Sequence, residues 1–267
     1  MIKSDFHAHT VFCDGKNTAR EMVRAACDKG LSAFGLSGHG YTPFDGSYCM
    51  SENDTDSYLY ELSQLKAEYS GKIDIFAGIE ADLYSEFDRS RFDYVIGSVH
   101  YIKTDGGYID VDNTPQILKN AAKTYFGGDM LTLCERYYEE MSELKNADII
   151  GHFDLITKFS EREALFDTDC RRYRMSALSA LDSLLDRDAV FEVNTGAISR
   201  GYRTTPYPAP FILDRIYERG GRVILTSDAH DTNCICAHFD SAVAILKEIG
   251  FKSIATLTIG GFREMGI

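Results

Sequence analysis

The chain has 267 residues, of which 44% are hydrophobic and 26% are charged, as in an ordinary globular protein. Its formal net charge of −13 repels polyanions and argues against a long nucleic-acid substrate, although a local group of cations would still bind a small phosphorylated one. No apolar stretch approaches the ~18 residues of a membrane span, the first residues lack an apolar signal core, and the seven cysteines are irregularly spaced, so we expect a cytoplasmic protein with reduced thiols and no membrane partner.

The first predicted element is a strand, residues 2–9, which contains His7 and His9. Because residues two apart in a strand face the same side, these histidines present two imidazoles to one metal ion. Two alternating histidines alone are a weak signal, because such a pair is more often part of a polar surface than of a metal site. The loop that follows contains Asp14, which by itself is more readily a turn former than a ligand.

Helices and short apolar strands then alternate along the chain. Helices are predicted after the capping box at residues 18–21, around 59–69, over 115–125, after residue 129 to 144, and over 175–185, 208–219 and 243–249. Strands are predicted at residues 33–38, 74–80, 94–99, 148–151, 189–194 and 223–229, with the apolar tail 254–259 as a last strand. The alternation continues without a repeat or a linker, so we predict a single domain over residues 1–267, of the α/β class, with a parallel barrel.

Six of the seven histidines lie at the ends of these strands: His7, His9, His39, His100, His152 and His230. Glu80 ends another strand, at a position from which one carboxylate can bridge two ions. In parallel barrels the carboxyl ends of the strands share one face, where catalytic residues gather. The sequence therefore predicts a metal site at that face. His238 matches no such position, and we expect it to be an ordinary surface or helix-start residue.

Several motifs together resemble the polymerase-and-histidinol-phosphatase (PHP) superfamily. They are His7-Ala-His9, Asp14-Gly15, His39, Gly78-Ile-Glu80, Gly97-Ser-Val-His100, Gly151-His-Phe-Asp154 and Ser227-Asp-Ala-His230. Within these, the motifs around His100 and His152, together with Glu192-Val-Asn-Thr-Gly196, resemble the histidinol-phosphatase type, and the resemblance runs from residue 4 to about residue 245. It implies a distorted (β/α)7 TIM-like barrel that holds two or three divalent transition-metal ions at its C-terminal face.

The resemblance also implies the ligands of each ion. His7, His9, Glu80 and Asp228 would bind the first, Glu80, His100 and His152 the second, and Asp14, His39 and His230 the third. Other branches of the superfamily have a histidine in place of Asp14, so the identity and occupancy of the third ion stay open. Mixed imidazole and carboxylate ligands suit Zn²⁺, Fe²⁺ or Mn²⁺.

The expected chemistry is hydrolysis of a phosphate monoester. Three divalent ions and three ligand carboxylates leave a net charge of about +3, which attracts a dianionic phosphate. An ion pair bridged by Glu80 would lower the pKa of a shared water towards ~7 and direct the resulting hydroxide in line at phosphorus. The expected catalytic residues are Glu80, Asp228, His230 and Arg200, with Asp228 or His230 protonating the leaving alkoxide. The expected substrate contacts are Arg200 and Lys158 to the phosphate, and Tyr41, Phe44 and Tyr101 to the alcohol.

The resemblance alone identifies the substrate as L-histidinol phosphate, and other functions stay open. The chain could hydrolyse another small phosphate ester, or be a non-catalytic metal-binding regulator, which would be expected to have lost ligands. An amidohydrolase would usually carry a carboxylated lysine where this chain has Glu80, and an exonuclease is disfavoured by the net charge of −13. We expect a monomer or a small homo-oligomer.

Overall fold

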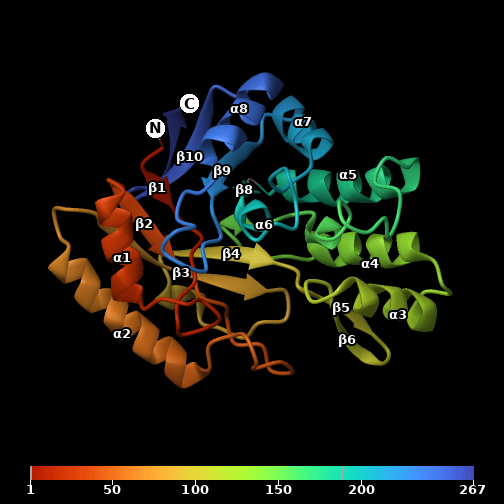
Figure 1. The fold of residues 1–267 in the computed structure, drawn as a ribbon, viewed down its shortest axis with the longest axis horizontal. Helices are drawn as coiled ribbons and strands as arrows, with labels where there is room; N and C mark the ends of the chain where they lie inside the picture. The colour runs from red at the N-terminus through yellow and green to blue at the C-terminus, as the bar shows by residue number, and fades with distance from the viewer. Residues whose placement is uncertain (1, 188) are drawn as a thin grey trace.

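The computed structural model describes residues 2–187 and 189–267, and nine of the strands in these ranges form one curled sheet within a mixed α/β fold (Figure 1). In spatial order the strands are β1 (Ser4–Asp5), β2 (Ala33–Leu36), β3 (Asp74–Asp82), β4 (Tyr94–Ser98), β7 (Ile149–Ile150), β8 (Val190–Asn194), β9 (Arg222–Thr226), β10 (Ser253–Thr258) and β11 (Gly261–Gly266). Neighbours from β1 to β10 are parallel, and β11 is antiparallel to β10. The mixed α/β class and the mainly parallel sheet expected from the sequence are confirmed.

The sheet curls until its first strand meets the segment after β9. Ala8 forms a parallel bridge with Ala229. The His9 N–H donates to the Ala229 carbonyl at 2.8 Å, and the Ala229 N–H donates to the His7 carbonyl at 3.0 Å. The segment after β1 therefore meets the segment after β9 at the carboxyl ends of the strands.

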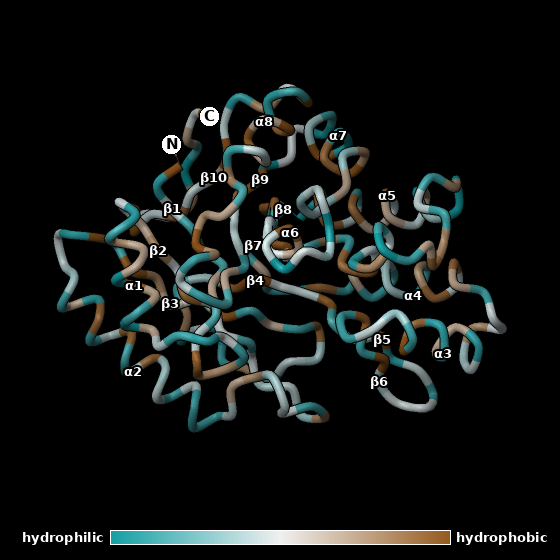
Figure 2. Tube along the Cα trace, viewed as in Figure 1, coloured by the Kyte–Doolittle hydropathy of each residue, from teal (hydrophilic) through white to brown (hydrophobic). Residues whose placement is uncertain are grey.

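Helices cover the outside of this sheet. They are α1 (Ala19–Asp28), α2 (Glu52–Glu68), α3 (Pro115–Tyr125), α4 (Met130–Ser142), α5 (Arg171–Leu185), α6 (Gly196–Ser199), α7 (Pro210–Glu218) and α8 (Phe239–Ile249), with 3-10 turns η1 (Arg89–Arg91) and η2 (Leu155–Thr157). In Figure 1, α1 and α2 flank β1 to β3, whereas α3, α4 and α5 lie together at the other end of the molecule. Figure 2 shows hydrophobic and hydrophilic residues alternating along these outer helices, as expected when one helical face is buried. None of the helices in the described residues is long and apolar enough to cross a membrane.

The inner face of the sheet is apolar at the amino ends of its strands. One residue or two from almost every strand contribute to this inner cluster: Phe6, Ala33, Phe76, Tyr94, Ile96, Ile149, Val190, Ile224, Ala255 and Leu257. Tyr94 fits here because β2 and β3 carry glycines, since a Cβ on Gly35 or on Gly78 would come within 2.2 Å of its side chain. This apolar cluster packs beneath the polar residues at the carboxyl ends of the strands.

Most of the helices and strands predicted from the sequence are present in the structure, but some begin or end at other residues. The first strand covers Ser4–Asp5 rather than residues 2–9, and the helix expected from Pro208 begins at Pro210. The capping box of α1 is present, with Thr18 Oγ1 accepting from the Glu21 N–H. The hairpin of β5 (Tyr101–Thr104) and β6 (Gly107–Asp110), the short helix α6 and strand β11 were not predicted.

Candidate metal centre

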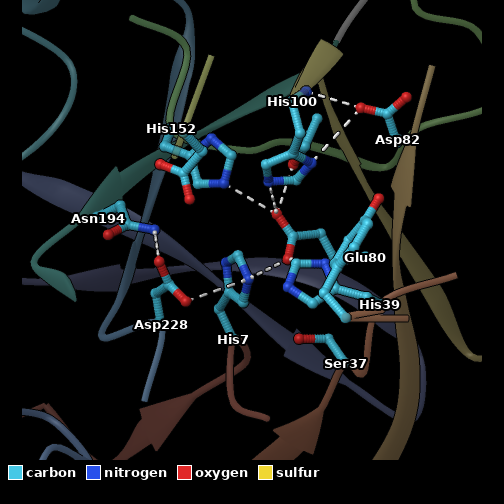
Figure 3. A network of polar contacts seen from close by, with 12 residues as sticks. His7, Ser37, His39, Glu80, Asp82, His100, His152, Asn194 and Asp228 are labelled. Carbon is cyan, nitrogen blue, oxygen red and sulfur yellow. Dashed lines mark hydrogen bonds and ion pairs between the residues drawn. The ribbon is translucent and has the colours of Figure 1, made fainter. Parts of the chain in front are cut away.

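The strand ends bring all nine expected ligands into one connected group. His7 and His9 follow β1, His39 follows β2, Glu80 lies in β3, His100 follows β4, His152 follows β7, and Asp228 and His230 follow β9. Asp14 reaches the group from the loop after His9, its Oδ2 lying 3.1 Å from His230 Nε2. Figure 3 shows six of these side chains pointing toward one another from different strand ends: His7, His39, Glu80, His100, His152 and Asp228.

Glu80 is the centre of the group, and its side chain is only 1% exposed. Four imidazoles surround it: His7 Nε2 at 3.0 Å and His39 Nδ1 at 3.1 Å from Oε2, and His152 Nε2 at 2.9 Å and His100 Nε2 at 3.4 Å from Oε1. Burial opposes ionisation of the carboxyl, but its interactions with the surrounding histidines, with His7 the largest, outweigh burial and hold the pKa of Glu80 well below its ordinary value. A single buried carboxylate is thus shared by histidines of four strand ends.

A second part of the group contains Asp228 and Asp14. Asp228 Oδ1 lies 3.2 Å from His9 Nε2, and Asp14 Oδ1 lies 3.5 Å from His9 Nδ1 and 3.7 Å from His39 Nε2. Among residues 2–187 and 189–267, three sets of donor atoms are close enough to hold an ion: His9, Asp14, His39 and His230; His7, His9 and Glu80; and His39, Glu80 and His100. The first set adds His9 to the three residues expected around the third ion.

The donor atoms fit divalent transition metals. His7 Nε2 and His9 Nε2 are buried and make no hydrogen bond to any described residue, although carboxylate oxygens lie 3.0 and 3.2 Å away. Burial lowers the pKa of His39 to about 3, which keeps its imidazole neutral, the form that binds a metal. Unpaired ring nitrogens facing buried carboxylates are the arrangement expected of ligands that converge on cations.

Two further carboxylates orient the histidines, and sequence reasoning gave them no role. Glu192 of β8 accepts hydrogen bonds from His7 Nδ1 at 2.5 Å and from the His152 N–H at 2.7 Å. Asp82 of β3 accepts from the His100 N–H at 2.6 Å. A glutamate in the middle of the apolar run Val190–Asn194 was the available signal, because a carboxylate is buried there only when it has partners.

Arg200 lies at the edge of the metal centre, next to Asp228. Its Nη2 lies 2.8 Å from Asp228 Oδ2, and Nη1 donates to the Asp228 carbonyl at 3.1 Å. Burial acts to lower the pKa of the guanidinium, but the charge of Asp228 outweighs it, so the pKa is raised and Arg200 stays cationic. The structure therefore brings a fixed positive charge to the ligand group.

The other expected substrate contacts have different surroundings. Lys158 Nζ lies 2.7 Å from Asp112 Oδ1. The Tyr101 hydroxyl donates to Asp45 at 2.8 Å. The ring of Phe44 packs edge-on against the ring of Tyr101, with 5.0 Å between the ring centroids. Tyr41 lines a surface depression together with Ile79. Ile79 directly precedes Glu80 in β3, so its side chain points to the opposite face of the strand from Glu80.

Tyr48 is an aromatic neighbour of the ligands that sequence reasoning missed. Its ring packs edge-on against His39 at 4.8 Å and lies 6.0 Å from the ring of Tyr101. It belongs to a loop without regular structure, where no periodic pattern marks which side chains face inward. His238 directly precedes α8, at the helix-start position expected for it.

Comparisons with known proteins identify the family to which the chain is similar. The model of the PHP domain matches residues 5–196. A relative in Deinococcus radiodurans named probable histidinol-phosphatase is 30% identical, over 94% of this chain and 95% of its own length. The histidinol-phosphatase of Bacillus subtilis is 26% identical, over 86% of this chain and 94% of its own length.

The same architecture occurs among solved structures. The histidinol phosphate phosphatase of Lactococcus lactis, solved in complex with zinc, L-histidinol and phosphate, superposes with a TM-score of 0.73. The two chains are 22% identical, and the match covers 98% of each. This likeness supports the fold of the whole chain.

Proposed function

The chain belongs to the PHP domain family, and from that premise we propose that it is a metal-dependent phosphate monoester hydrolase that converts L-histidinol phosphate and water to L-histidinol and phosphate in histidine biosynthesis. One observation carries the proposal. The buried carboxylate of Glu80 lies within 3.4 Å of the ring nitrogens of four histidines, and Arg200 forms an ion pair with Asp228 at the edge of the same group. Relatives that match nearly the full chain and are named histidinol-phosphatase support the choice of substrate.

The cofactors proposed are two to three divalent transition-metal ions, Zn, Fe or Mn. His7, His9, Glu80 and Asp228 would hold one, Glu80, His100 and His152 a second, and Asp14, His39 and His230 a third. When bound, such ions activate water for attack near neutral pH and neutralise charge on the phosphate. Histidine and carboxylate donors together suit these metals better than Mg²⁺, which prefers oxygen ligands.

The chain's own residues position the ester and handle its protons. Arg200 binds phosphate oxygens with its planar guanidinium, which offers paired charge-assisted hydrogen bonds. Asp228 or His230, both in contact with Arg200, takes up the proton that the attacking water loses and passes it to the leaving alkoxide. Phe44 and Tyr101 are the proposed contacts to the alcohol. Lys158 and Tyr41 stay predictions as substrate contacts, because Lys158 is bonded to Asp112 and Tyr41 lines a different depression.

We also propose that residues 1–267 form one domain, a distorted (β/α)7 barrel extended by β10 and β11, with its metal site at the carboxyl ends of the strands. Two observations support this. The match to the PHP domain ends at residue 196, whereas Arg200, Asp228 and His230 follow it and still join the ligand group. The bridge between Ala8 and Ala229 connects the first strand to the last part of the site. The cytoplasmic location and the monomeric or small homo-oligomeric state stay predictions.

Phosphate release from a panel of monoesters, measured with metal content on the same purified sample, tests the proposed function. We expect L-histidinol phosphate to be the preferred ester, and Glu80→Gln to lower kcat by ~10³ or more with the fold retained, because the bridging charge is lost. If the metal-loaded parent released no phosphate from any ester, the non-catalytic alternative would replace this proposal. A preference for a different ester would keep the reaction class and change the substrate.

A further inference from the structure

We propose that Asn194 is a positioning residue that keeps the carboxylate of Asp228 in place while Arg200 binds the phosphate of the substrate. Asn194 belongs to the motif Glu192-Val-Asn-Thr-Gly196, but its place there assigned it no role. The role of Arg200 in this inference rests on the proposed function, in which the guanidinium binds phosphate oxygens. The role of Asn194 rests on the contacts of its own side chain.

Asn194, the last residue of β8, has a partner for each end of its amide group. Its Nδ2 donates to Glu192 Oε2 at 3.0 Å and to Asp228 Oδ2 at 3.3 Å, and Figure 3 shows the contact with Asp228. At the other end, Oδ1 accepts from the Gly196 N–H at 2.8 Å. Because one end faces two carboxylates and the other faces an N–H group, only one orientation of the amide satisfies all three partners.

The two oxygens of Asp228 have different surroundings. Oδ1 faces imidazoles, since it lies 3.2 Å from His9 Nε2 and 3.5 Å from His230 Nδ1. Oδ2 accepts hydrogen bonds from Arg200 Nη2 at 2.8 Å and from Asn194 Nδ2. A carboxylate held through Oδ2 presents Oδ1 to a metal ion, and two side chains share the task of holding it.

Exposure distinguishes these two side chains. The side chain of Arg200 is 32% exposed, whereas that of Asp228 is 5% exposed and Asn194 is fully buried. A phosphate that binds Arg200 competes with Asp228 for the guanidinium, because phosphate and carboxylate oxygens are both acceptors of charge-assisted hydrogen bonds. If Arg200 alone held Oδ2, phosphate binding would release the carboxylate. Asn194 keeps a donor on Oδ2 when the guanidinium turns to the phosphate.

The backbone next to Asn194 packs directly against the ion pair. A Cβ on Gly196, the first residue of α6, would lie 2.8 Å from Asp228 Cβ and 3.0 Å from Arg200 Nη2. Arg200 directly follows α6. Residues 194–200 therefore supply the amide, the packing surface and the guanidinium that surround one carboxylate.

The experiment is a double-mutant cycle measured by binding. The variants are Asn194→Ala, Asn194→Leu, Arg200→Ala, and Asn194→Ala combined with Arg200→Ala. Leucine fills the volume of the amide without offering a donor, so it separates the lost hydrogen bond from the effect of a cavity. Asn120→Ala, at an exposed position of α3, is the control. Competition with a chelator gives the Zn²⁺ affinity, and titration calorimetry at saturating Zn²⁺ gives the dissociation constant of inorganic phosphate.

Zinc affinity tests whether the two side chains share the support of Asp228. We expect both Asn194 variants to bind Zn²⁺ about 10-fold more weakly, and Arg200→Ala, in which the amide still holds Oδ2, to stay within about threefold of the parent. The combined variant should lose more than the product of the two single losses, because no donor remains on Oδ2. Asn120→Ala should match the parent.

Phosphate affinity tests whether Asn194 frees Arg200 for the anion. In both Asn194 variants the dissociation constant of phosphate should rise by about 10-fold, because phosphate binding then leaves Oδ2 without a donor. In the Arg200→Ala background, Asn194→Ala should change this constant by less than about twofold. A side chain that only stabilised the fold would lower the thermal midpoint and leave both affinities unchanged.

Three results would overturn the inference. The first is an unchanged Zn²⁺ affinity in both Asn194 variants, and the second is a loss in the combined variant that equals the product of the single losses. The third is an unchanged phosphate constant in both Asn194 variants while Arg200→Ala raises it. If neither Asn194 variant folded, the residue would be a support of the fold, and the inference would be wrong as well.

Failure of the proposed function would look different. If the zinc-loaded parent neither bound phosphate nor released it from any ester, the proposed function and the role of Arg200 would fall. A loss of Zn²⁺ affinity in the combined variant larger than the product of the single losses would still show that Asn194 positions Asp228. If the parent bound no Zn²⁺, both proposals would be overturned together.

Discussion

Glu192 shows how one buried residue can hold several parts of the site in place. Besides His7 and His152, it accepts hydrogen bonds from Thr226 Oγ1 at 2.7 Å and from Asn194 Nδ2 at 3.0 Å. The side chain is fully buried. Burial opposes its ionisation, but His7 outweighs this and lowers the pKa of the carboxyl. With Nδ1 donating to Glu192, His7 directs Nε2 toward Glu80, so the glutamate fixes both the tautomer and the orientation of a ligand.

We expect Glu192→Gln to weaken metal binding by about 10- to 100-fold, because the amide offers one acceptor oxygen and turns its NH₂ toward groups that are themselves donors. Competition against a chelator of known affinity measures this directly, without reference to activity. At saturating metal, kcat should return to within about threefold of the parent. Glu248→Gln, at an exposed position of α8, is the matched control. Unchanged metal affinity would show that the preformed ligands need no support from Glu192.

At the scale of elements, β2 and β3 are shaped to accept Tyr94 of β4. The Tyr94 hydroxyl donates to the Phe6 carbonyl at 2.5 Å, and the ring lies over Gly78, where a Cβ would come 2.2 Å from the ring carbon Cζ. We expect Gly78→Ala to lower the free energy of unfolding by at least ~2 kcal/mol, since the overpacked ring has no room to move. Urea unfolding measures this.

The controls for Gly78 use other positions of the chain. Gly46→Ala should change stability by at most ~0.5 kcal/mol, because a Cβ at Gly46 meets nothing within 4 Å. Combining Gly78→Ala with Tyr94→Leu should cost less than the two single changes added together, because the smaller side chain relieves the clash. Strict additivity would mean that the cost at Gly78 has another origin.

How far the sequence could predict these elements depends on the kind of signal each one carries. Buried parallel strands have apolar runs bounded by histidines, so the strands that lead to His39, His100, His152 and His230 could be located from the chain alone. Strand β11 could not, because it is partly exposed and includes Arg263 and Glu264, which mask its pairing with β10. Strand β11 forms because it pairs with β10, and no local sequence pattern indicates that pairing.

The residues of the candidate site also differ in how far the sequence alone could predict them. The proposed ligands could be predicted because a metal site of this kind needs histidines or carboxylates at strand ends. Supporting residues such as Glu192, Asp82 and Tyr48 are chosen by the three-dimensional surroundings of a ligand, and their positions follow no fixed spacing from it. Lys158 was expected to bind phosphate because of its charge, and its hydrogen bonds to Asp112 are visible only when the hairpin after His100 is folded.

At the scale of the whole molecule, the ligand group joins the first and last parts of the chain. His9 lies 3.2 Å from Asp228, and Asp5 accepts a hydrogen bond from the Ser227 N–H at 3.1 Å across the same junction. The buried carboxylates Glu80, Asp82, Asp228 and Glu192 lie in or beside this group. Ions bound there would neutralise these charges and tie together segments more than 200 residues apart in sequence, so metal binding and global stability should be coupled.

We therefore expect chelation to lower the thermal midpoint of the parent by roughly 5 °C or more and to abolish phosphate release, with both restored by Zn²⁺ or Mn²⁺. The midpoint should rise with the logarithm of free metal concentration, because a ligand that binds only the folded state stabilises it by mass action. In Glu80→Gln, which lacks the charge shared by the ligand sets, the shift on chelation should be much smaller. Scanning calorimetry of both proteins, with and without chelator, measures these midpoints. Equal midpoints for the metal-loaded and the metal-free parent would contradict the expected coupling. The contact between Ala8 and Ala229 would then be stabilised by hydrogen bonds and packing alone.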